Sequence, residues 1–160
     1  MGFQRRVFFD EDLAGVVREA APHLLEAFLA FVRPIEKADF VRYALMYRDG
    51  GVYADMDQEL SDPRGLLRLA ASGFAVLPLE KVKQIGQSIL VSPPNHSFWM
   101  GLMEDIVRRY DSNCYEIFTA GPGAISNFWK HSGGCSTWGP RNVAIASDLM
   151  AYRDAGSVTR

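Results

Sequence analysis

The chain lacks the features that define several large classes of protein. It has 2 cysteines in 160 residues, Cys114 and Cys135, which are too few for a disulfide framework and are not spaced as a CxxC pair. Its most apolar stretch, residues 24–32, is interrupted by Glu26 and is far shorter than the roughly 20 residues that cross a bilayer. We therefore expect free thiols and no transmembrane segment in this chain.

An excess of basic charge is also missing. The chain has 17 Lys and Arg against 19 Asp and Glu, which gives a formal charge of -2 and a pI near 5.9. Proteins that bind nucleic acid need a basic surface for the phosphate backbone, so no nucleic-acid partner is expected. No internal repeat, low-complexity block or Pro/Gly/Ser-rich linker divides the sequence. With 48% apolar residues, the chain is expected to form a single domain over 1–160.

Apolar periodicity and turn residues predict helices that alternate with short strands. Strands are expected at 52–54, 74–79 and 88–91, and a further apolar run lies at 143–146. Helices are expected over 12–20, 22–32, from 34 to the glycine pair at 50–51, from 63 to 69, over 97–110 with Asn95 as its cap, and over 122–130. This alternation predicts an α/β fold with a mixed sheet flanked by helices.

Two aspartates follow the expected strand at 52–54. Residues two apart in an extended chain face the same side, so Asp55 and Asp57 present two carboxylates to one point. Mg²⁺ or Mn²⁺ would relieve their repulsion, and these ions commonly complete their ligand shell with water and substrate phosphates. The strand is apolar and is expected to be buried, so that it holds both carboxylates on a rigid element. The pair thus indicates a phosphate-bearing ligand, and the alternative is an acidic surface turn.

A second pair of charged residues lies on the helix that precedes this strand. Asp39 and Arg42 are three residues apart, which places an acceptor and a forked donor on one helical face. Such a pair can accept hydrogen bonds from sugar hydroxyls and share the charge of a diphosphate. The alternative is an ion pair on a solvated face, which contributes about 0.3 to 0.5 kcal/mol.

Together these residues resemble the DXD-containing sugar-binding region of glycosyltransferase family 32. That family includes Golgi α-1,6-mannosyltransferases and α-1,4-galactosyltransferases, and the large clostridial glucosylating toxins are more distant relatives. Its pattern has Ala-Asp-x-x-Arg-Tyr on a helix, then Gly-Gly-x-Tyr, then Asp-x-Asp. The resemblance extends more loosely over about 8–128. The matching positions are Ala38, Asp39, Arg42, Tyr43, Gly50, Gly51, Tyr53, Asp55 and Asp57.

The resemblance implies a GT-A fold and a retaining transfer from a nucleotide sugar, UDP- or GDP-linked, to a glycan or lipid acceptor. It implies that Asp57 binds Mn²⁺ or Mg²⁺ directly and that Asp55 holds the metal shell and the ribose. Asp39 and Arg42 would grip the transferred sugar and its diphosphate. No catalytic residue is assigned. The predicted donor-binding residues are Asp39, Arg42, Tyr53, Asp55 and Gly121, and the predicted metal ligands are Asp55 and Asp57.

The sequence also departs from the family pattern. It begins after the place where the first nucleotide-binding strand is expected, and Ala120 stands where the family has Thr before Gly121. These departures predict the central portion of a catalytic domain, and they leave a degenerate glycan-binding remnant as an alternative. A haloacid-dehalogenase-type phosphatase is a second alternative, against which Gln58 and Glu59 argue. The resemblance implies a Golgi membrane location in a eukaryote, and a cytoplasmic or membrane-associated one in a bacterium.

Overall fold

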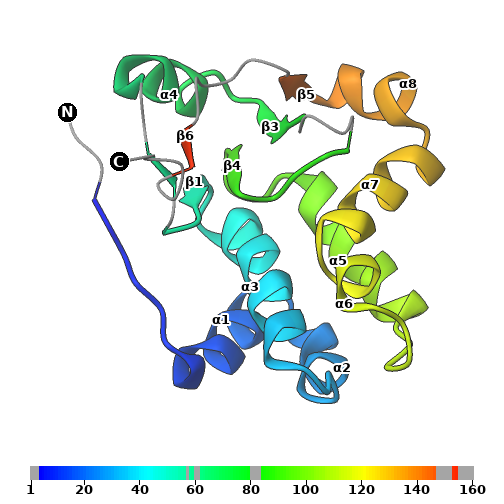
Figure 1. Ribbon diagram of the computed structural model, residues 1–160. Helices are drawn as coiled ribbons and strands as arrows, with labels where there is room; N and C mark the ends of the chain where they lie inside the picture. The colour runs from blue at the N-terminus through cyan, green and yellow to red at the C-terminus, as the bar shows by residue number, and fades with distance from the viewer. Residues whose placement is uncertain (1–3, 57, 60–61, 80–83, 147–152, 155–160) are drawn as a thin grey trace.

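The computed structural model describes residues 4–56, 58–59, 62–79, 84–146 and 153–154 (Figure 1). The helices are α1 (Leu13–Ala20), α2 (Leu25–Leu29), α3 (Pro34–Arg48), α4 (Pro63–Ala70), α5 (Ser97–Arg109), α6 (Glu116–Thr119), α7 (Pro122–His131) and α8 (Gly134–Trp138). The strands are β1 (Gly51–Ala54), β2 (Gln58–Glu59), β3 (Ala75–Pro78), β4 (Ile89–Ser92), β5 (Val143–Ala146) and β6 (Arg153–Asp154). The predicted α/β class is confirmed. Among the described helices, none combines the length and apolar character needed to cross a membrane.

Four strands form a mixed sheet in the order β1-β4-β3-β5. β4 runs antiparallel to both β1 and β3, whereas β3 and β5 are parallel. β2 and β6 form a separate antiparallel pair. The mixed sheet was predicted, but the prediction that 52–54 is a buried strand is wrong. β1 lies at the end of the sheet, so Val52 and Tyr53 are only partly buried and Ala54 is exposed.

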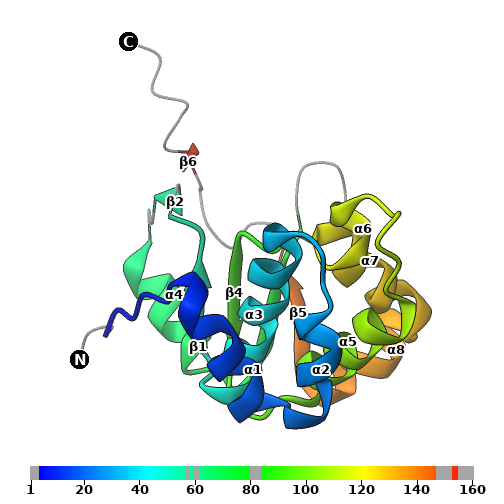
Figure 2. The same ribbon diagram turned by 90° about the horizontal axis from the view of Figure 1, so that it is seen from below.

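Alternate residues of the central strands face two separate cores. Leu77 and Leu90 pack into the main core with α1, α3 and α5, whereas Val76 and Val91 pack with Leu66 of α4. This division follows from the strand geometry, in which successive side chains point to opposite faces. In Figure 2 α3 lies in front of the sheet, between the labels β4 and β5, and α5 lies to one side of it. The sheet therefore separates a large helical layer from α4, and α3 contributes to the larger core.

Local chemistry fixes both ends of α3. Pro34 occupies its first turn, and Glu36 accepts a hydrogen bond from the Arg33 backbone N–H at 3.1 Å. At the other end Gly50 has a φ of +65°, and a Cβ there would lie 2.5 Å from the Pro94 nitrogen. Only glycine satisfies both conditions. This tight turn leads directly from α3 into β1, as predicted, and it brings the end of β1 back beside the middle of the helix.

Two local predictions are wrong. The helix expected over 22–32 consists of a 3-10 turn, Pro22–Leu24, followed by the short α2. Asn95 does not cap α5, because its φ of +58° places it in a turn and its N–H donates to the Tyr47 carbonyl. The cap is His96, whose side chain accepts a hydrogen bond from the Phe98 N–H at 3.3 Å. These are choices between neighbouring polar residues, which tertiary contacts decide.

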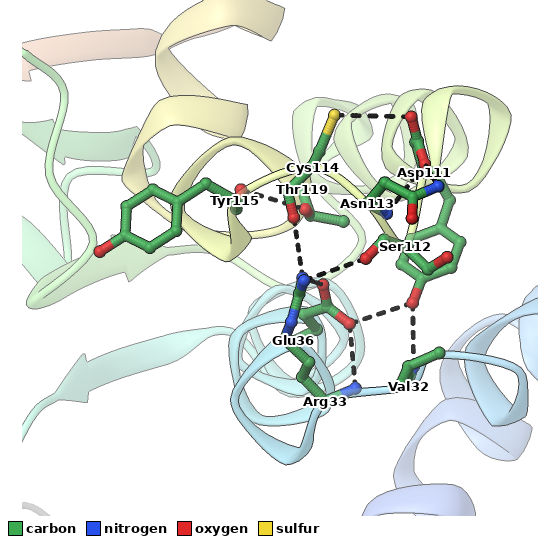
Figure 3. A network of polar contacts seen from close by, with 10 residues as sticks. Val32, Arg33, Glu36, Asp111, Ser112, Asn113, Cys114, Tyr115 and Thr119 are labelled. Carbon is green, nitrogen blue, oxygen red and sulfur yellow. Dashed lines mark hydrogen bonds and ion pairs between the residues drawn. The ribbon is translucent and has the colours of Figure 1, made fainter.

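A buried polar network joins the start of α3 to the segment after α5 (Figure 3). The Glu36 side chain is fully buried, accepts from Arg33 Nη1 at 2.9 Å and lies 3.1 Å from the Tyr110 hydroxyl. The Arg33 guanidinium also donates to the carbonyls of Ser112 and Cys114, at 3.0 and 2.8 Å. This network, Arg33–Glu36–Tyr110, fixes the segment 110–115 against the helix that carries Asp39 and Arg42.

Changing Glu36 to glutamine is expected to lower the free energy of unfolding by about 1 to 3 kcal/mol, because it removes a buried, hydrogen-bonded charge that three groups recognise. Urea denaturation measures this difference. The matched control is Glu19→Gln on the exposed ion pair with Arg48, which is expected to change the free energy of unfolding by less than about 1 kcal/mol. Equal losses in the two variants would contradict a special role for the buried network.

Candidate functional site

The predicted site residues come from separate elements that meet where β1 ends. Asp39 and Arg42 lie on the middle of α3, and Asp55 directly follows β1. The Asp55 N–H donates to the Ser88 carbonyl at 2.9 Å, which brings the residues just before β4 to the same place. Gly121 is the N-terminal cap of α7. Residues far apart in the sequence thus line one end of the sheet beside α3.

Asp39 and Arg42 form a buried ion pair. Arg42 Nη2 lies 2.5 Å from Asp39 Oδ1, and the two side chains are 5% and 8% exposed. The alternative of an ion pair on a solvated face is therefore wrong. Burying a charged pair carries a desolvation cost that its own attraction does not reliably offset, so stability alone does not explain it. A buried pair of this kind is typical of a functional site.

Gln87 holds this pair in place, although no motif in the sequence marks it. Its Nε2 donates to Asp39 Oδ1 at 2.8 Å, and its backbone carbonyl accepts from Arg42 Nη1 at 3.2 Å. Its Oε1 lies 2.5 Å from the Tyr43 hydroxyl, which is also 2.9 Å from the Ala120 carbonyl. One buried amide therefore connects α3, the start of β4 and the residue before Gly121. In the sequence, Gln87 shows only as a polar residue ahead of an apolar strand.

Asp55 extends the network towards solvent. Its Oδ1 accepts from Arg42 Nη1 at 3.3 Å and from the Tyr53 hydroxyl at 2.6 Å. The Arg42 guanidinium carbon lies 4.8 Å from the centre of the Tyr53 ring, within range of a cation–π contact. Burial, reinforced by the hydrogen bond to Asp55, raises the pKa of Tyr53 well above its usual value. Tyr53 therefore remains a protonated donor that orients the Asp55 carboxylate.

Two polar groups in this cluster have no hydrogen-bond partner among the described residues. Arg42 Nε is buried and has no hydrogen-bond partner among the described residues. Asp39 Oδ2 receives no hydrogen bond from a described residue and faces Gly121, where a Cβ would lie 3.3 Å from it. Native proteins rarely leave buried polar groups unpaired, and the exceptions call for a specific explanation. An ion pair that keeps one unpaired donor on Arg42 and one unpaired acceptor on Asp39 suits a polyhydroxylated or phosphorylated ligand.

Gly121 is close-packed between two elements. A Cβ there would stand 2.9 Å from the Ile117 Cα, in addition to its contact with Asp39. A side chain at this position would push α6 away from α3 or fill the space beside Asp39 Oδ2. Gly121 therefore joins Asp39, Arg42, Tyr53 and Asp55 at one place. Their role in binding a donor stays a prediction.

The predicted metal ligands are described only in part. Asp57 lies outside the described residues, and within the described ranges no group of three or more His, Cys, Asp and Glu is placed to hold a metal ion. Asp55 is 33% exposed, and its second oxygen receives no hydrogen bond from a described residue. Mg²⁺ and Mn²⁺ need only one or two protein carboxylates when substrate phosphates and water supply the rest. Asp55 is chemically suited to such a site.

The environment of Asp39 raises the pKa of its carboxyl group towards neutral pH. Burial is the main cause and raises the pKa of Asp39 to about 6, although Arg42 and the Gln87 hydrogen bond oppose it. The charges of Asp55 and Glu116 raise it further. A carboxyl group titrating near neutral pH beside a cation is typical of binding and catalytic sites.

The mixed α/β sheet carries Asp55 at the end of a strand, beside the buried Asp39–Arg42 pair. Residues 3–68 match the family model described as "Glycosyltransferase sugar-binding region containing DXD motif". This match confirms the resemblance to the DXD glycosyltransferases, and it includes Asp39, Arg42, Asp55 and Asp57. It favours the glycosyltransferase interpretation over the phosphatase alternative.

Two curated relatives are the mannosyl phosphorylinositol ceramide synthases CSH1 and SUR1 of Saccharomyces cerevisiae. Each is 30% identical to this chain, over 131 and 128 residues respectively. The alignments cover 76% of this chain and 32% of each relative, so the chain spans about a third of the relatives' length. Among solved structures, PaToxG Glycosyltransferase matches with a TM-score of 0.51 and 16% identity, over 82% of this chain and 45% of that one. The structural match supports the GT-A-like fold.

Proposed function

We propose that this chain is the donor-binding part of a metal-dependent, retaining mannosyltransferase, which moves mannose from a nucleotide sugar to the head group of a phosphoinositol lipid. One observation carries the proposal. The buried Asp39–Arg42 pair has an unpaired N–H and an unpaired carboxylate oxygen, and it contacts Asp55, the first aspartate of the DXD motif. A sugar diphosphate presents the complementary groups, namely hydroxyl donors on the sugar and anionic oxygens on the diphosphate.

In this proposal Asp39 and Arg42 bind different parts of the donor. Asp39 Oδ2 accepts a hydrogen bond from a sugar hydroxyl, and the Arg42 guanidinium donates to the diphosphate. Because Gln87 and Asp55 already hold the remaining edges of the guanidinium and the carboxylate, little reorganisation is needed on binding. Preorganised donors aimed at developing negative charge are the main source of transition-state stabilisation in such sites. The Arg42 group is placed to serve in this way as the sugar leaves the diphosphate.

The proposal assigns the metal to the DXD motif. Asp55 and Asp57 would hold Mn²⁺ or Mg²⁺, an ion whose chemistry is to neutralise charge on the departing nucleoside diphosphate. Asp55 has a second task that does not depend on the ion, because its Oδ1 accepts hydrogen bonds from Arg42 and Tyr53. Asp55 thereby fixes the position of the guanidinium relative to the acidic motif.

The identities of the transferred sugar and of the acceptor are inferred from the relatives. The names of both yeast proteins describe the synthesis of mannosyl phosphorylinositol ceramide. Identity of 30% extends over most of this chain, so we infer the same transferred sugar and a phosphoinositol-bearing lipid as acceptor. A lipid acceptor would place the reaction at a membrane surface.

The test is a donor screen followed by a transfer assay. Thermal-shift titrations with UDP- and GDP-linked mannose, glucose and galactose, each with and without Mn²⁺, are expected to show metal-dependent stabilisation by a mannose donor. Radiolabelled mannose from that donor should then appear in a phosphoinositol lipid held in detergent micelles. If no nucleotide sugar stabilises the chain with or without a metal, the proposal is wrong and the non-catalytic remnant is the better interpretation.

Donor binding is expected to weaken as the pH falls through about 6, because the pKa of Asp39 is raised to that value and only the ionised carboxylate pairs with Arg42. Below the pKa, the ionised fraction falls about tenfold per pH unit, and the donor affinity should follow it. Calorimetric titration between pH 5 and 8 measures the effect. Asp39→Asn cannot ionise, so its weaker binding should be nearly constant over this range. A wild-type affinity that is flat from pH 8 to 5 would contradict the assignment.

A further inference from the structure

The segment that carries α6 lies directly against the proposed donor site. The Glu116 carbonyl accepts a hydrogen bond from the Gly121 N–H at 3.2 Å, and α6 packs on α3. Gly121 itself is closely flanked by Ile117 on one side and Asp39 on the other. The width of one glycine thus separates α6 from the group proposed to hold the transferred sugar. An acceptor has to approach the sugar from a surface of this kind.

α6 presents side chains that suit a polyol. Tyr115 and Phe118 are 58% and 56% exposed, which is unusual for two aromatic residues so close together. The Glu116 side chain is partly buried and forms no hydrogen bond or ion pair with another described residue, and its charge contributes to the raised pKa of Asp39. Aromatic faces bind the C–H face of a sugar or cyclitol ring, and a free carboxylate accepts hydrogen bonds from its hydroxyls.

The surface is held rigidly. The Arg33–Glu36–Tyr110 network fixes the backbone up to Cys114, and in Figure 3 the Tyr115 side chain points away from that network. The Phe118 ring packs on Gly123, where a Cβ would come within 2.5 Å of Phe118 Cδ1. The glycine therefore lets the ring pack against the start of α7. A surface fixed in this way loses little conformational freedom when a ligand binds.

We propose that Tyr115, Glu116 and Phe118 form the acceptor site and bind the inositol ring of a phosphoinositol lipid. The inference rests on the proposed function and adds the location of the acceptor. Two exposed apolar residues favour a lipid over a free sugar. Ile35 lies one turn before Asp39 on the same face of α3, and Val32 is joined to the segment after α5 through a hydrogen bond from its N–H to Tyr110. In this proposal their exposed side chains contact the apolar part of the lipid.

The test measures two reactions of the same mannose donor, transfer to a lipid and hydrolysis. With the full chain and a mannose donor, transfer to phosphatidylinositol in detergent micelles and transfer to water are measured together. Glu116→Gln and Tyr115→Ala are each expected to lower the ratio of lipid transfer to hydrolysis at least tenfold, chiefly through a higher KM for the lipid. The control is Phe74→Ala, which removes an aromatic ring that is 38% exposed before β3, and which should leave the ratio unchanged.

The outcomes separate the two proposals. Hydrolysis with an unaltered ratio in both α6 variants would overturn the acceptor site and leave the proposed function intact. Methyl α-mannoside serving as a better acceptor than phosphatidylinositol would overturn the choice of a lipid. If the unchanged chain neither hydrolyses nor transfers from any nucleotide sugar, the proposed function fails and the acceptor site fails with it. Melting temperatures of the variants, expected to match the unchanged chain, exclude misfolding as the cause of a lower ratio.

Discussion

Changing Arg42 to lysine is expected to lower kcat/KM for the mannose donor by about 100- to 1000-fold, the range found when one preorganised donor to a developing negative charge is removed. The guanidinium contacts Asp39, Asp55 and the Gln87 carbonyl at once, and its Nε has no partner among the described residues. An ammonium group has one centre and cannot reproduce this planar fork. Initial rates of donor hydrolysis at saturating Mn²⁺ measure the effect.

Arg48→Lys is the matched control for Arg42. Arg48 ends the same helix but pairs with Glu19 and Asp49, away from the site, so its replacement should alter kcat/KM less than about twofold. Circular dichroism would confirm that both variants keep their helices. If Arg42→Lys matched the unchanged chain in activity, Arg42 would be only a structural partner of Asp39, and the central observation behind the proposed function would lose its meaning.

The motif residues were predictable because the chain itself brings them together. A helix, a two-glycine turn and a short strand fold Asp39, Arg42 and Asp55 into one hairpin-like unit, and the spacing 39–42–55 reflects it. The burial of Asp39 and Arg42 was not predictable from this unit. It depends on Gln87 and Gly121, which reach Asp39 through the pairing of β1 with β4 and the packing of α6 on α3. Such long-range contacts leave no periodic signal in the sequence.

For the fold, too, local elements could be predicted and their long-range arrangement could not. Elements with strong local signals, such as α3 between Pro34 and Gly50, were predicted nearly to the residue. The order of the strands could not be predicted. β1 pairs with β4, although β3 is nearer to β1 in the sequence. An apolar triplet such as 52–54 suits a central or an edge strand equally well. Because β1 lies at the edge of the sheet, Asp55 is partly exposed to solvent. A ligand needs this access to reach the aspartate.

Changing Asp57 to alanine is expected to abolish Mn²⁺-dependent turnover, with a loss of about 1000-fold or more. A bound divalent cation contributes several kcal/mol of charge stabilisation, and each 1.36 kcal/mol corresponds to a factor of ten in rate. Asp55→Asn should lower the rate as well, for a different reason. It weakens the acceptor of hydrogen bonds from Arg42 and Tyr53 in addition to removing a metal ligand. Measuring rate as a function of Mn²⁺ concentration separates the two effects.

The two aspartate variants are expected to differ in their response to Mn²⁺ and to pH. Raising Mn²⁺ should partly restore Asp57→Ala, because its Arg42 network is intact, whereas Asp55→Asn should recover less at any concentration. Asp55→Asn should also lower the pH midpoint of donor binding, since the Asp55 charge raises the pKa of Asp39. Glu104→Ala, which removes an exposed carboxylate beside His23, serves as the control and should change neither curve. Unchanged turnover in Asp57→Ala would show that the second aspartate of the motif holds no metal, and the metal-dependent mechanism would then be wrong.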